Sequence, residues 1–354
     1  MLKCILLPQY QDVRPAAIMC PRNKLYYVRS RQIYSHDFNS EVQNETGLFD
    51  TNYIGKEYLD QISMNTLELE PMLLIYNTFH LFSVKMMVYW EGNDGEDCFE
   101  LVTICTNGQD KWREVIQTNR CSCIGPPCFI NADEIAVLDL ELKHILIKDM
   151  RNEVVTHIDH CFPLSEHSAI FPGGGEGKLI IRVDSNAILF SVDRNVILGE
   201  IYVPDMTNVV WADDSSKVAI ICKYGLIVAD AQMKHLVSVE EKVKIWSGAW
   251  DASPSGGSAN EIFVYTTLHN IKYCIIACKE VGIIQPLNEA LYVMRVVKDE
   301  LFGISRDGLP QIVSIDTTEA LFKLYLSKKQ VRTKPISVFH DHLNRNAHFI
   351  YQFF

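Results

Sequence analysis

A hairpin of two apolar strands around a tight polar turn recurs along this chain of 354 residues. The four clearest copies run from Ile135 to Asp149, from Leu179 to Asp193, from Val218 to Asp230 and from Leu301 to Asp316. Their spacing is about 40 residues, the period of one propeller blade. One small sheet cannot bury both of its faces until neighbouring sheets stack on it, so such units occur in series. The repeat therefore predicts an all-β fold, a β-propeller.

Weaker copies of the hairpin indicate how many blades there are. They lie at Lys24 to Phe38 and at Glu261 to Ile276. Between Phe38 and Ile135, the apolar segments Met72 to Asn77 and Cys98 to Cys105 fit one further blade. We expect about seven blades, with an irregular insertion at about residues 46–120 that leaves open whether one blade is complete.

Two tryptophans indicate the register of the repeat. Trp211 and Trp250 lie 39 residues apart, each followed by Asp and Ser residues that can bend the chain into the next strand. We therefore expect them at equivalent positions of consecutive blades. The predicted propeller covers residues 14–326, and a divergent basic tail covers residues 327–354.

The composition excludes several classes of protein. There are 33 Lys and Arg residues against 44 Asp and Glu residues, and the resulting net charge of −11 repels a phosphate backbone, so nucleic acid is not an expected partner. The 11 cysteines are scattered rather than spaced as a small disulfide framework, which indicates a reducing cytoplasm. The apolar stretch near Met1 is shorter than a signal-peptide core. Lys85 in the middle of the apolar window Pro71 to Trp90 favours buried strands over a membrane span.

A glycine-rich segment, Gly173 to Gly177, resembles a phosphate-binding loop, in which backbone N–H groups approach phosphate and a Lys reaches the outer oxygens. The pattern fails in three ways. Pro172 stands where the first Gly is needed, Leu179 replaces the Ser or Thr that would hold magnesium, and a strand follows instead of a helix. A surface turn between strands is the favoured interpretation.

Soft side chains on both sides of the hairpin from Ile135 to Asp149 could in principle bind zinc. They are Cys121, Cys123, Cys128, His157, His160, Cys161 and His167. Structural zinc sites use ligand pairs two to four residues apart, and the Cys-x-Cys motif here lacks a matching second pair. The favoured interpretation is loop and strand thiols with solvated histidines, so no metal is expected.

No nucleophile motif of the Gly-x-Ser-x-Gly type is present, and no Ser, His and Asp set is singled out by spacing. The acidic residues Asp213, Asp214 and Asp251 follow the two tryptophans, where capping of turns is a sufficient role. We expect no enzyme and assign no catalytic, cofactor-binding or metal-binding residue.

Longer stretches resemble the second WD-repeat propeller of the coatomer alpha subunit, part of the COPI vesicle coat. They lie in the family's order at Leu25 to Ser40, Ile145 to Val154, Val209 to Val228, Ser247 to Asp251, Val264 to Tyr273, Leu291 to Val296 and Ile315 to Leu326. The resemblance implies a structural scaffold in Golgi-to-ER and intra-Golgi transport. The implied partners are other coatomer subunits, especially beta-prime, with peripheral association of the coat with Golgi membranes and COPI vesicles.

The chain also departs from that family. The family's first propeller, which recognises dilysine cargo tails, would precede Met1, so no cargo-binding residue can be assigned here. The helical solenoid expected after Leu326 is replaced by a divergent tail containing Lys328, Lys329, Arg332 and Lys334. An alternative function is a free-standing propeller that binds short peptide motifs. A charged ring around the central axis would favour that alternative, whereas apolar patches at the edges would favour a scaffold.

Overall fold

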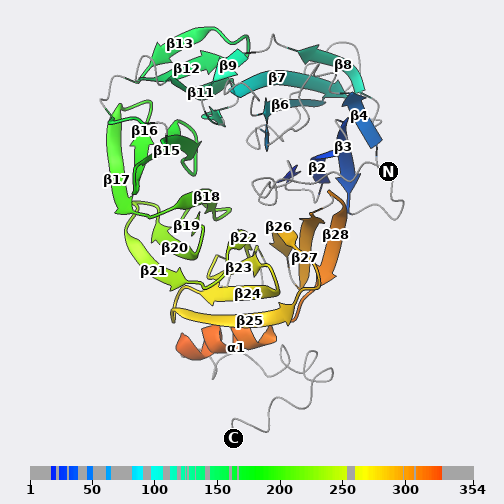
Figure 1. The fold of residues 1–354 in the computed structure, drawn as a ribbon, viewed down its shortest axis with the longest axis vertical. Helices are drawn as coiled ribbons and strands as arrows, with labels where there is room; N and C mark the ends of the chain where they lie inside the picture. Colours follow the sequence, from blue (N-terminus) through cyan, green and yellow to red (C-terminus); the bar gives the residue numbers. More distant parts are fainter. Residues whose placement is uncertain are drawn as a thin grey trace, which may run out of the picture.

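Each recurring hairpin forms the second and third strands of a small antiparallel sheet, and the sheets stand side by side around a central axis (Figure 1). The described residues form seven sheets, of which five have four strands, one has three and one has five. The prediction of an all-β propeller of about seven blades is confirmed. The computed structural model describes residues 17–20, 24–29, 32–38, 46–50, 61–64, 82–90, 97–106, 112–117, 121–123, 125, 127–131, 133–139, 144–158, 162–165, 167–252, 260–297, 299–306 and 308–328.

The first three blades follow one another along the chain. Blade 1 contains β1 (Ala17–Cys20), β2 (Lys24–Arg29), β3 (Gln32–Asp37) and β4 (Thr46–Asp50). Blade 2 contains β5 (Gln61–Met64), β6 (Phe82–Trp90), β7 (Asp97–Thr106), β8 (Trp112–Gln117) and β9 (Cys121–Cys123). Blade 3 contains β10 (Cys128–Phe129), β11 (Glu134–Asp139), β12 (His144–Asp149) and β13 (Val154–His157).

The remaining blades keep the same order of strands. Blade 4 contains β14 (Ala169–Pro172), β15 (Lys178–Val183), β16 (Asn186–Ser191) and β17 (Val196–Tyr202). Blade 5 contains β18 (Met206–Trp211), β19 (Lys217–Cys222), β20 (Gly225–Asp230) and β21 (His235–Glu240). Blade 6 contains β22 (Ile245–Trp250), β23 (Ile262–Thr267), β24 (Asn270–Ile275) and β25 (Glu280–Pro286). Blade 7 contains β26 (Leu291–Val297), β27 (Glu300–Ser305) and β28 (Pro310–Ser314), and α1 (Thr318–Ser327) follows.

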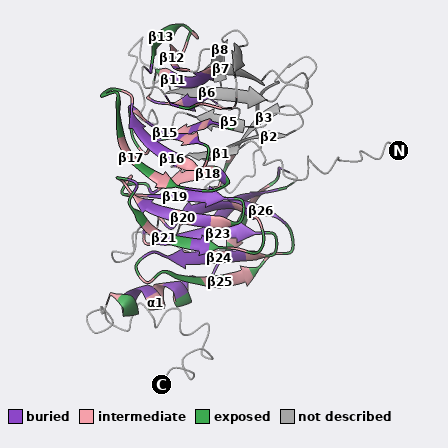
Figure 2. Cartoon of the chain, turned by 60° about the vertical axis from the view of Figure 1, so that its left-hand side comes forward, coloured by how far each residue is buried: buried purple, intermediate pink, exposed green. Residues whose placement is uncertain are grey.

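The middle strands of the blades are apolar at consecutive positions because neighbouring blades cover both of their faces. In β19, every residue after Lys217 is buried. The outermost strand β17 is instead exposed or half-buried along its whole length. Figure 2 shows this gradient from buried middle strands to exposed outer strands. A continuous apolar run is what a strand buried on both faces requires.

The aspartate at the end of the hairpin caps the turn that follows it. The carboxylate of Asp149 accepts hydrogen bonds from the backbone N–H groups of Arg151 at 2.9 Å and Glu153 at 2.8 Å. Asp230 accepts the equivalent pair, two and four residues later, both at 2.9 Å. Asp316 accepts one such bond at 3.0 Å from the backbone N–H two residues later, where α1 begins. The recurring Asp is therefore a turn signal, because its side chain replaces missing backbone partners.

The ring closes where blade 1 meets blade 7. The strand β1 lies beside β26 as well as beside β5. Leu25, which is fully buried, packs in one cluster with Tyr292 and Ile304 of blade 7. Phe38 lies edge-on to Phe302, with ring centroids 5.1 Å apart. Side-chain packing between the first and last blades therefore joins the two ends of the described ring.

The helix α1 packs outside blade 6 (Figures 1 and 2). Its residues Ala320 and Leu324 are buried in the core cluster shared by blades 6 and 7. Lys323 forms ion pairs with Glu280 of β25 at 3.3 Å and with Glu319 at 2.9 Å. The hydrogen bond with Glu319 is the largest of the effects that raise the pKa of Lys323. Thus α1 packs on the propeller and ends at Ser327, one residue beyond the boundary at residue 326 that the sequence suggested.

Residues 46–120 contain more regular structure than the sequence indicated. The structure places β4 to β8 in this range, and β6 pairs with β7 along nine residues of each strand. The apolar segment around Lys85 is therefore strand β6 of blade 2 from Phe82 onward. The predicted strand at Met72 to Asn77 lies outside the described residues, whereas Cys98 to Cys105 falls within β7 as expected.

Candidate interaction surfaces

Trp211 and Trp250 occupy equivalent positions, as their spacing predicted. Each is the last residue of the innermost strand of its blade. The indole N–H of Trp211 donates to the carbonyl oxygen of Pro172 at 2.8 Å, and that of Trp250 donates to the carbonyl oxygen of Val210 at 2.9 Å. Both acceptors lie on the innermost strand of the preceding blade. The tryptophans therefore join consecutive blades, and Trp250 also packs edge-on against Phe263 at 5.2 Å.

The glycine-rich loop between β14 and β15 is shaped by its neighbours. Gly174 has a φ of +72°, and a Cβ at this position would lie 2.3 Å from the ring of Trp211. Gly177 has a φ of +66°, and its Cβ would lie 2.2 Å from the carboxylate of Asp193. These positions need glycine because of backbone conformation and close packing. The loop therefore has a structural explanation that involves no phosphate.

The candidate zinc ligands are only partly described. Cys128 is buried in the core of blades 3 and 4, whereas His157 and His167 are exposed. His157 lies beside His144, with ring centroids 5.3 Å apart. No group of three or more His, Cys, Asp or Glu side chains that could hold a metal ion occurs among the described residues. His160 and Cys161 lie outside the described residues, as do the side chains of Cys121 and Cys123.

Three buried thiols should resist alkylation until the chain unfolds. Burial raises the pKa of Cys128 and Cys274 to about 12 and that of Cys222 to about 11. Because only the thiolate is nucleophilic, we expect iodoacetamide at pH 8 to label these residues in urea but not in the native chain. Peptide mass spectrometry should show Cys278, which is half-buried, labelling earlier. Native labelling of Cys128 as fast as that of Cys278 would contradict this prediction.

Because burial raises these thiol pKa values, the free energy of unfolding should fall as the pH becomes alkaline. A thiol whose pKa is higher in the folded chain releases its proton more readily once the chain unfolds. The stability contributed by protonated Cys128 is therefore present below its ordinary pKa of 9.0 and is lost as pH rises towards about 12.

The acidic residues that follow the tryptophans have structural surroundings. Asp213 and Asp214 are exposed, and the carboxylate of Asp214 accepts a 3.0 Å hydrogen bond from the backbone N–H of Ser216. Partial burial tends to raise the pKa of Asp214, but hydrogen bonds from Ser216 and Asn260 outweigh it and lower the pKa. Asp251 is buried, and its backbone bridges to β26 of blade 7. Turn capping therefore accounts for Asp214, and contact between blades accounts for Asp251.

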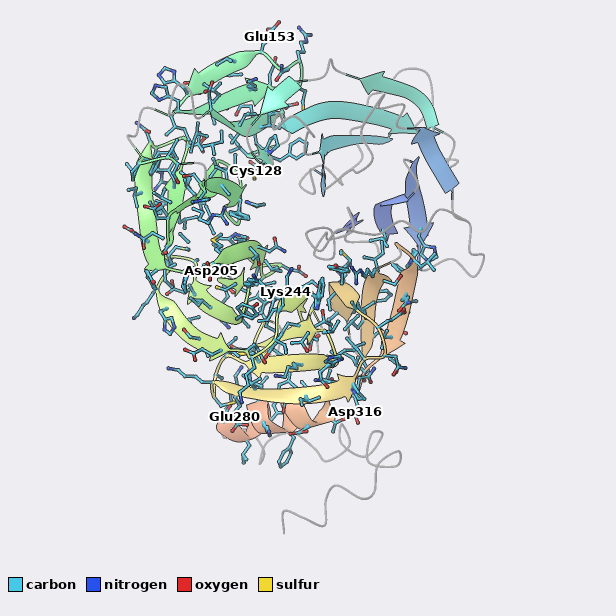
Figure 3. All side chains as sticks on the ribbon, in the orientation of Figure 1. Cys128, Glu153, Asp205, Lys244, Glu280 and Asp316 are labelled. Carbon is cyan, nitrogen blue, oxygen red and sulfur yellow. The ribbon has the colours of Figure 1, made fainter. Side chains whose placement is uncertain are left out.

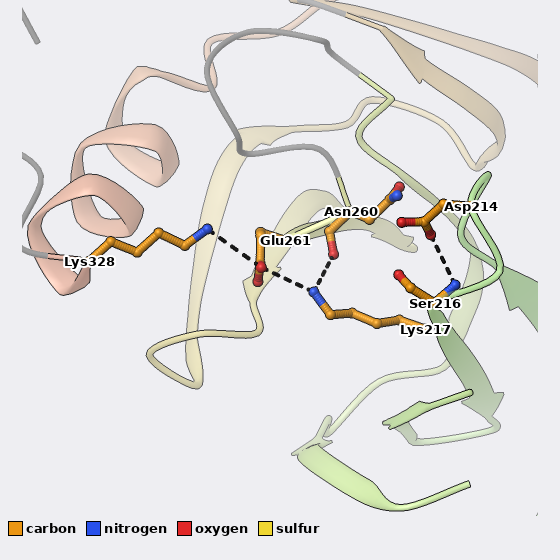
Figure 4. Close-up of polar contacts among 6 residues, drawn as sticks. All are labelled: Asp214, Ser216, Lys217, Asn260, Glu261 and Lys328. Carbon is orange, nitrogen blue, oxygen red and sulfur yellow. Dashed lines mark hydrogen bonds and ion pairs between the residues drawn. The ribbon is translucent and has the colours of Figure 1, made fainter. Parts of the chain in front are cut away.

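A charged network, which the sequence did not reveal, ties blade 5, blade 6 and the end of α1 together (Figure 4). The carboxylate of Glu261 lies 3.1 Å from Nζ of Lys217 and 3.5 Å from Nζ of Lys328. Nζ of Lys217 also donates to the carbonyl oxygen of Asn260 at 3.1 Å. Lys328, expected in a basic tail, is therefore part of an ion pair. The side chains come from segments far apart in sequence, so no short motif could identify them.

Apolar side chains are exposed along the outer strands and on α1, and we call this set the outer rim. It consists of Val154, Val155, Val196, Ile197, Tyr202, Val281, Ile283, Ile312, Phe322 and Leu326. Tyr202 is 67% exposed and Leu326 is 57% exposed. Val154 with Val155 and Val196 with Ile197 are neighbours on their strands, and apolar residues that gather in patches commonly mark protein contact sites. In Figure 3 the labelled Glu153, Glu280 and Asp316 lie at the periphery of the ring. None of the described residues forms a helix with the length and apolar content that crossing a bilayer requires.

Comparisons with known proteins agree with this architecture. Coatomer subunit alpha-1 of Oryza sativa subsp. japonica is 31% identical over 206 residues, covering 58% of this chain and 16% of the relative. Coatomer subunit alpha-2 of Arabidopsis thaliana is 32% identical over 217 residues, covering 61% of this chain and 17% of the relative. A chain in a crystal structure of the mitotic checkpoint complex shares the fold, with a TM-score of 0.54, 10% identity, and coverage of 84% of this chain and 86% of that chain.

The chain thus spans about a sixth of the length of these coatomer relatives. The family described as COPA/B second beta-propeller matches residues 33–305, which is most of the chain. The matched range begins within β3 of blade 1, includes blades 2 to 6 and ends with β27 of blade 7. Together with the alpha-subunit relatives, it confirms the resemblance seen in the sequence. The chain belongs to the family of COPA/B second β-propellers.

Proposed function

We propose that this chain is a structural scaffold module of the COPI vesicle coat that binds other coatomer subunits through its propeller body. The observation that carries the proposal is the family match over residues 33–305. The outer rim supports it, because exposed apolar side chains on rigid strands suit contact with another protein. No catalytic role is proposed, and the part played by the chain is to hold partners in position.

The proposal also names one partner subunit and the membranes that the chain reaches. We infer that the beta-prime subunit is among the partners and that the chain reaches Golgi membranes and COPI vesicles peripherally, through the coat. The relatives named coatomer subunit alpha support these inferences. One fold can host many unrelated functions, so the proposal rests on the family match and the relatives and not on the propeller fold itself.

Affinity purification tests the proposal. The tagged 354-residue chain, expressed in cells, should recover coatomer subunits including beta-prime. Two double variants place charges in the outer rim: Val154→Glu with Val155→Glu, and Ile283→Glu with Leu326→Glu. At least one of them should recover about tenfold less of the coatomer subunits, because burying a carboxylate in an apolar contact costs free energy. The control is Gln232→Glu, at an exposed polar residue. Recovery of no coatomer subunit by the unmodified chain would overturn the proposal.

A further inference from the structure

The strand β28 of blade 7 is less buried than its place in the sheet predicts. It is the third strand of its blade, and Figure 1 places it at the outer end of the described part of that blade. In other blades the third strand is mostly buried: five of the six residues of β16 and four of the six residues of β24 are buried. None of the five residues of β28 is buried, and the same holds for the outermost strands β17 and β25. The burial of β28 is therefore that of a strand at the edge of its sheet.

The backbone groups of β28 alternate between its two edges. The N–H of Ile315, directly after β28, donates to the carbonyl oxygen of Asp299 at 2.8 Å. In an antiparallel ladder, residues bonded to the partner strand alternate with residues whose groups point the other way. The register of β27 with β28 assigns Pro310, Ile312 and Ser314 to the second class. Their backbone groups therefore face away from β27, where a further strand can pair with them.

An apolar side chain on this edge lies beside the contact between blades 7 and 1. Ile312 is 49% exposed and stands directly opposite Phe302 of β27. Phe302 in turn packs edge-on against Phe38 of blade 1, with ring centroids 5.1 Å apart. A fourth strand beside β28 would cover Ile312 and extend the packing between the two blades. An edge with outward backbone groups and an exposed apolar side chain is a template for pairing with another strand.

We propose that this edge pairs with a segment of the same chain, Cys4 to Leu7, which precedes β1 and completes blade 7 as its fourth strand. The segment reads Cys-Ile-Leu-Leu and lies outside the described residues, so its assignment comes from its sequence and from its distance along the chain from β1. Its composition suits an outermost strand, since β17 begins Val-Ile-Leu. The short apolar run near Met1 thus receives a structural role.

The number of residues between the segment and β1 fits the propeller. In other blades the outermost strand leads into the innermost strand of the next blade. Three residues (203–205) separate β17 from β18, and eleven (158–168) separate β13 from β14. Nine residues (8–16) separate Leu7 from β1, which falls between these values. The order of strands that recurs around the ring is thereby kept at its last blade.

Reach and tethering favour this segment over a strand from another protein. The strand β1 lies beside β26, and the position outside β28 is three strand spacings, about 14 Å, from β26. Nine extended residues span up to about 30 Å, so the segment reaches this position. A segment held by a short tether has an effective concentration of about 1 mM, which a free partner must exceed. The chain itself is therefore the favoured source of the fourth strand.

This closure goes beyond the scaffold role and does not rest on it. It assigns Ile312, one of the residues of the outer rim, to the completion of blade 7 and not to contact with coat partners. The variants that test the scaffold proposal lie elsewhere, on β13, β25 and α1. The two proposals can therefore fail independently.

Hydrogen exchange of the purified 354-residue chain, with fragmentation mass spectrometry to resolve single residues, tests the closure. The amides of Ile312 and Ser314 should exchange at least tenfold more slowly in the unmodified chain than in a variant with Ile5→Asp and Leu6→Asp, because a bonded amide must open before it exchanges. Two adjacent residues are changed because successive side chains of a strand point to opposite faces. One Asp then meets the face that carries Ile312 in either register, where burying a carboxylate costs free energy.

Two controls accompany this variant. Gln9→Asp with Gln11→Asp adds the same two charges to the connection before β1 and should leave exchange of the Ile312 and Ser314 amides within about twofold. The amide of Val313 faces β27 and should stay protected in every variant. Its protection separates loss of the fourth strand from unfolding of blade 7.

Two results would overturn the closure. The first is exchange of the Ile312 and Ser314 amides in the unmodified chain as fast as in an unstructured peptide. The second is protection that the Ile5→Asp and Leu6→Asp variant leaves unchanged, since another segment would then cover β28. Failure to recover coatomer subunits in affinity purification, with protection of β28 retained, would count against the scaffold proposal alone.

Discussion

Replacing Trp250 by Ala should destabilise the chain by about 3–5 kcal/mol, the range for deleting a large buried aromatic side chain. The side chain is 4% exposed and belongs to the core cluster shared by blades 5 and 6. Its loss removes the contact with Phe263 and the hydrogen bond to Val210 at once. The carbonyl group of Val210 is then left without that donor, which adds to the cost of the cavity. Urea unfolding followed by circular dichroism measures the change.

Two further variants separate packing from hydrogen bonding at this junction. Trp250→Phe keeps an aromatic ring but has no N–H group, so it should cost less than Trp250→Ala. Trp211→Ala removes the equivalent side chain of blade 5, which is half-buried, and should also cost less. An effect of Trp250→Ala below about 0.5 kcal/mol, the range of an ordinary surface substitution, would show that the junction does not stabilise the ring.

The sequence predicted the blades because their strands and turns are encoded locally. A continuous apolar run identifies a strand buried on both faces, and β19 fits this description. The Asp that ends the hairpin was visible as a repeat, and its hydrogen bonds at Asp149 and Asp230 explain why it recurs. The tryptophan spacing was also informative, because both indoles bond to the preceding blade.

Other features depend on contacts between distant segments and could not be predicted. The pairing of β6 with β7 was missed because the segment around Lys85 carries polar residues that interrupt the apolar run. The ion pairs of Glu261 join Lys217 and Lys328, which lie 111 residues apart in the numbering.

Ring closure is the feature on which a propeller most depends, since each blade contacts only its neighbours. Leu25→Ala should therefore cost about 2–5 kcal/mol, because Leu25 is fully buried at the contact between blade 1 and blade 7. Ile304→Ala lies in the same cluster and should cost a similar amount. Both effects can be measured by urea unfolding, with thermal unfolding as a second measurement.

A double-mutant cycle shows whether the two sides of this contact act together. Residues in contact have coupling energies of about 0.5–3 kcal/mol, so the double variant of Leu25 and Ile304 should cost less than the sum of its single variants. The control pairs Leu25→Ala with Leu179→Ala, whose side chain lies in a separate core cluster, and should be additive within about 0.5 kcal/mol. Additive behaviour of Leu25 with Ile304 would mean that packing between the first and last blades does not close the ring. Coupling confined to that pair would establish that the two ends of the described chain stabilise each other, as a closed propeller requires.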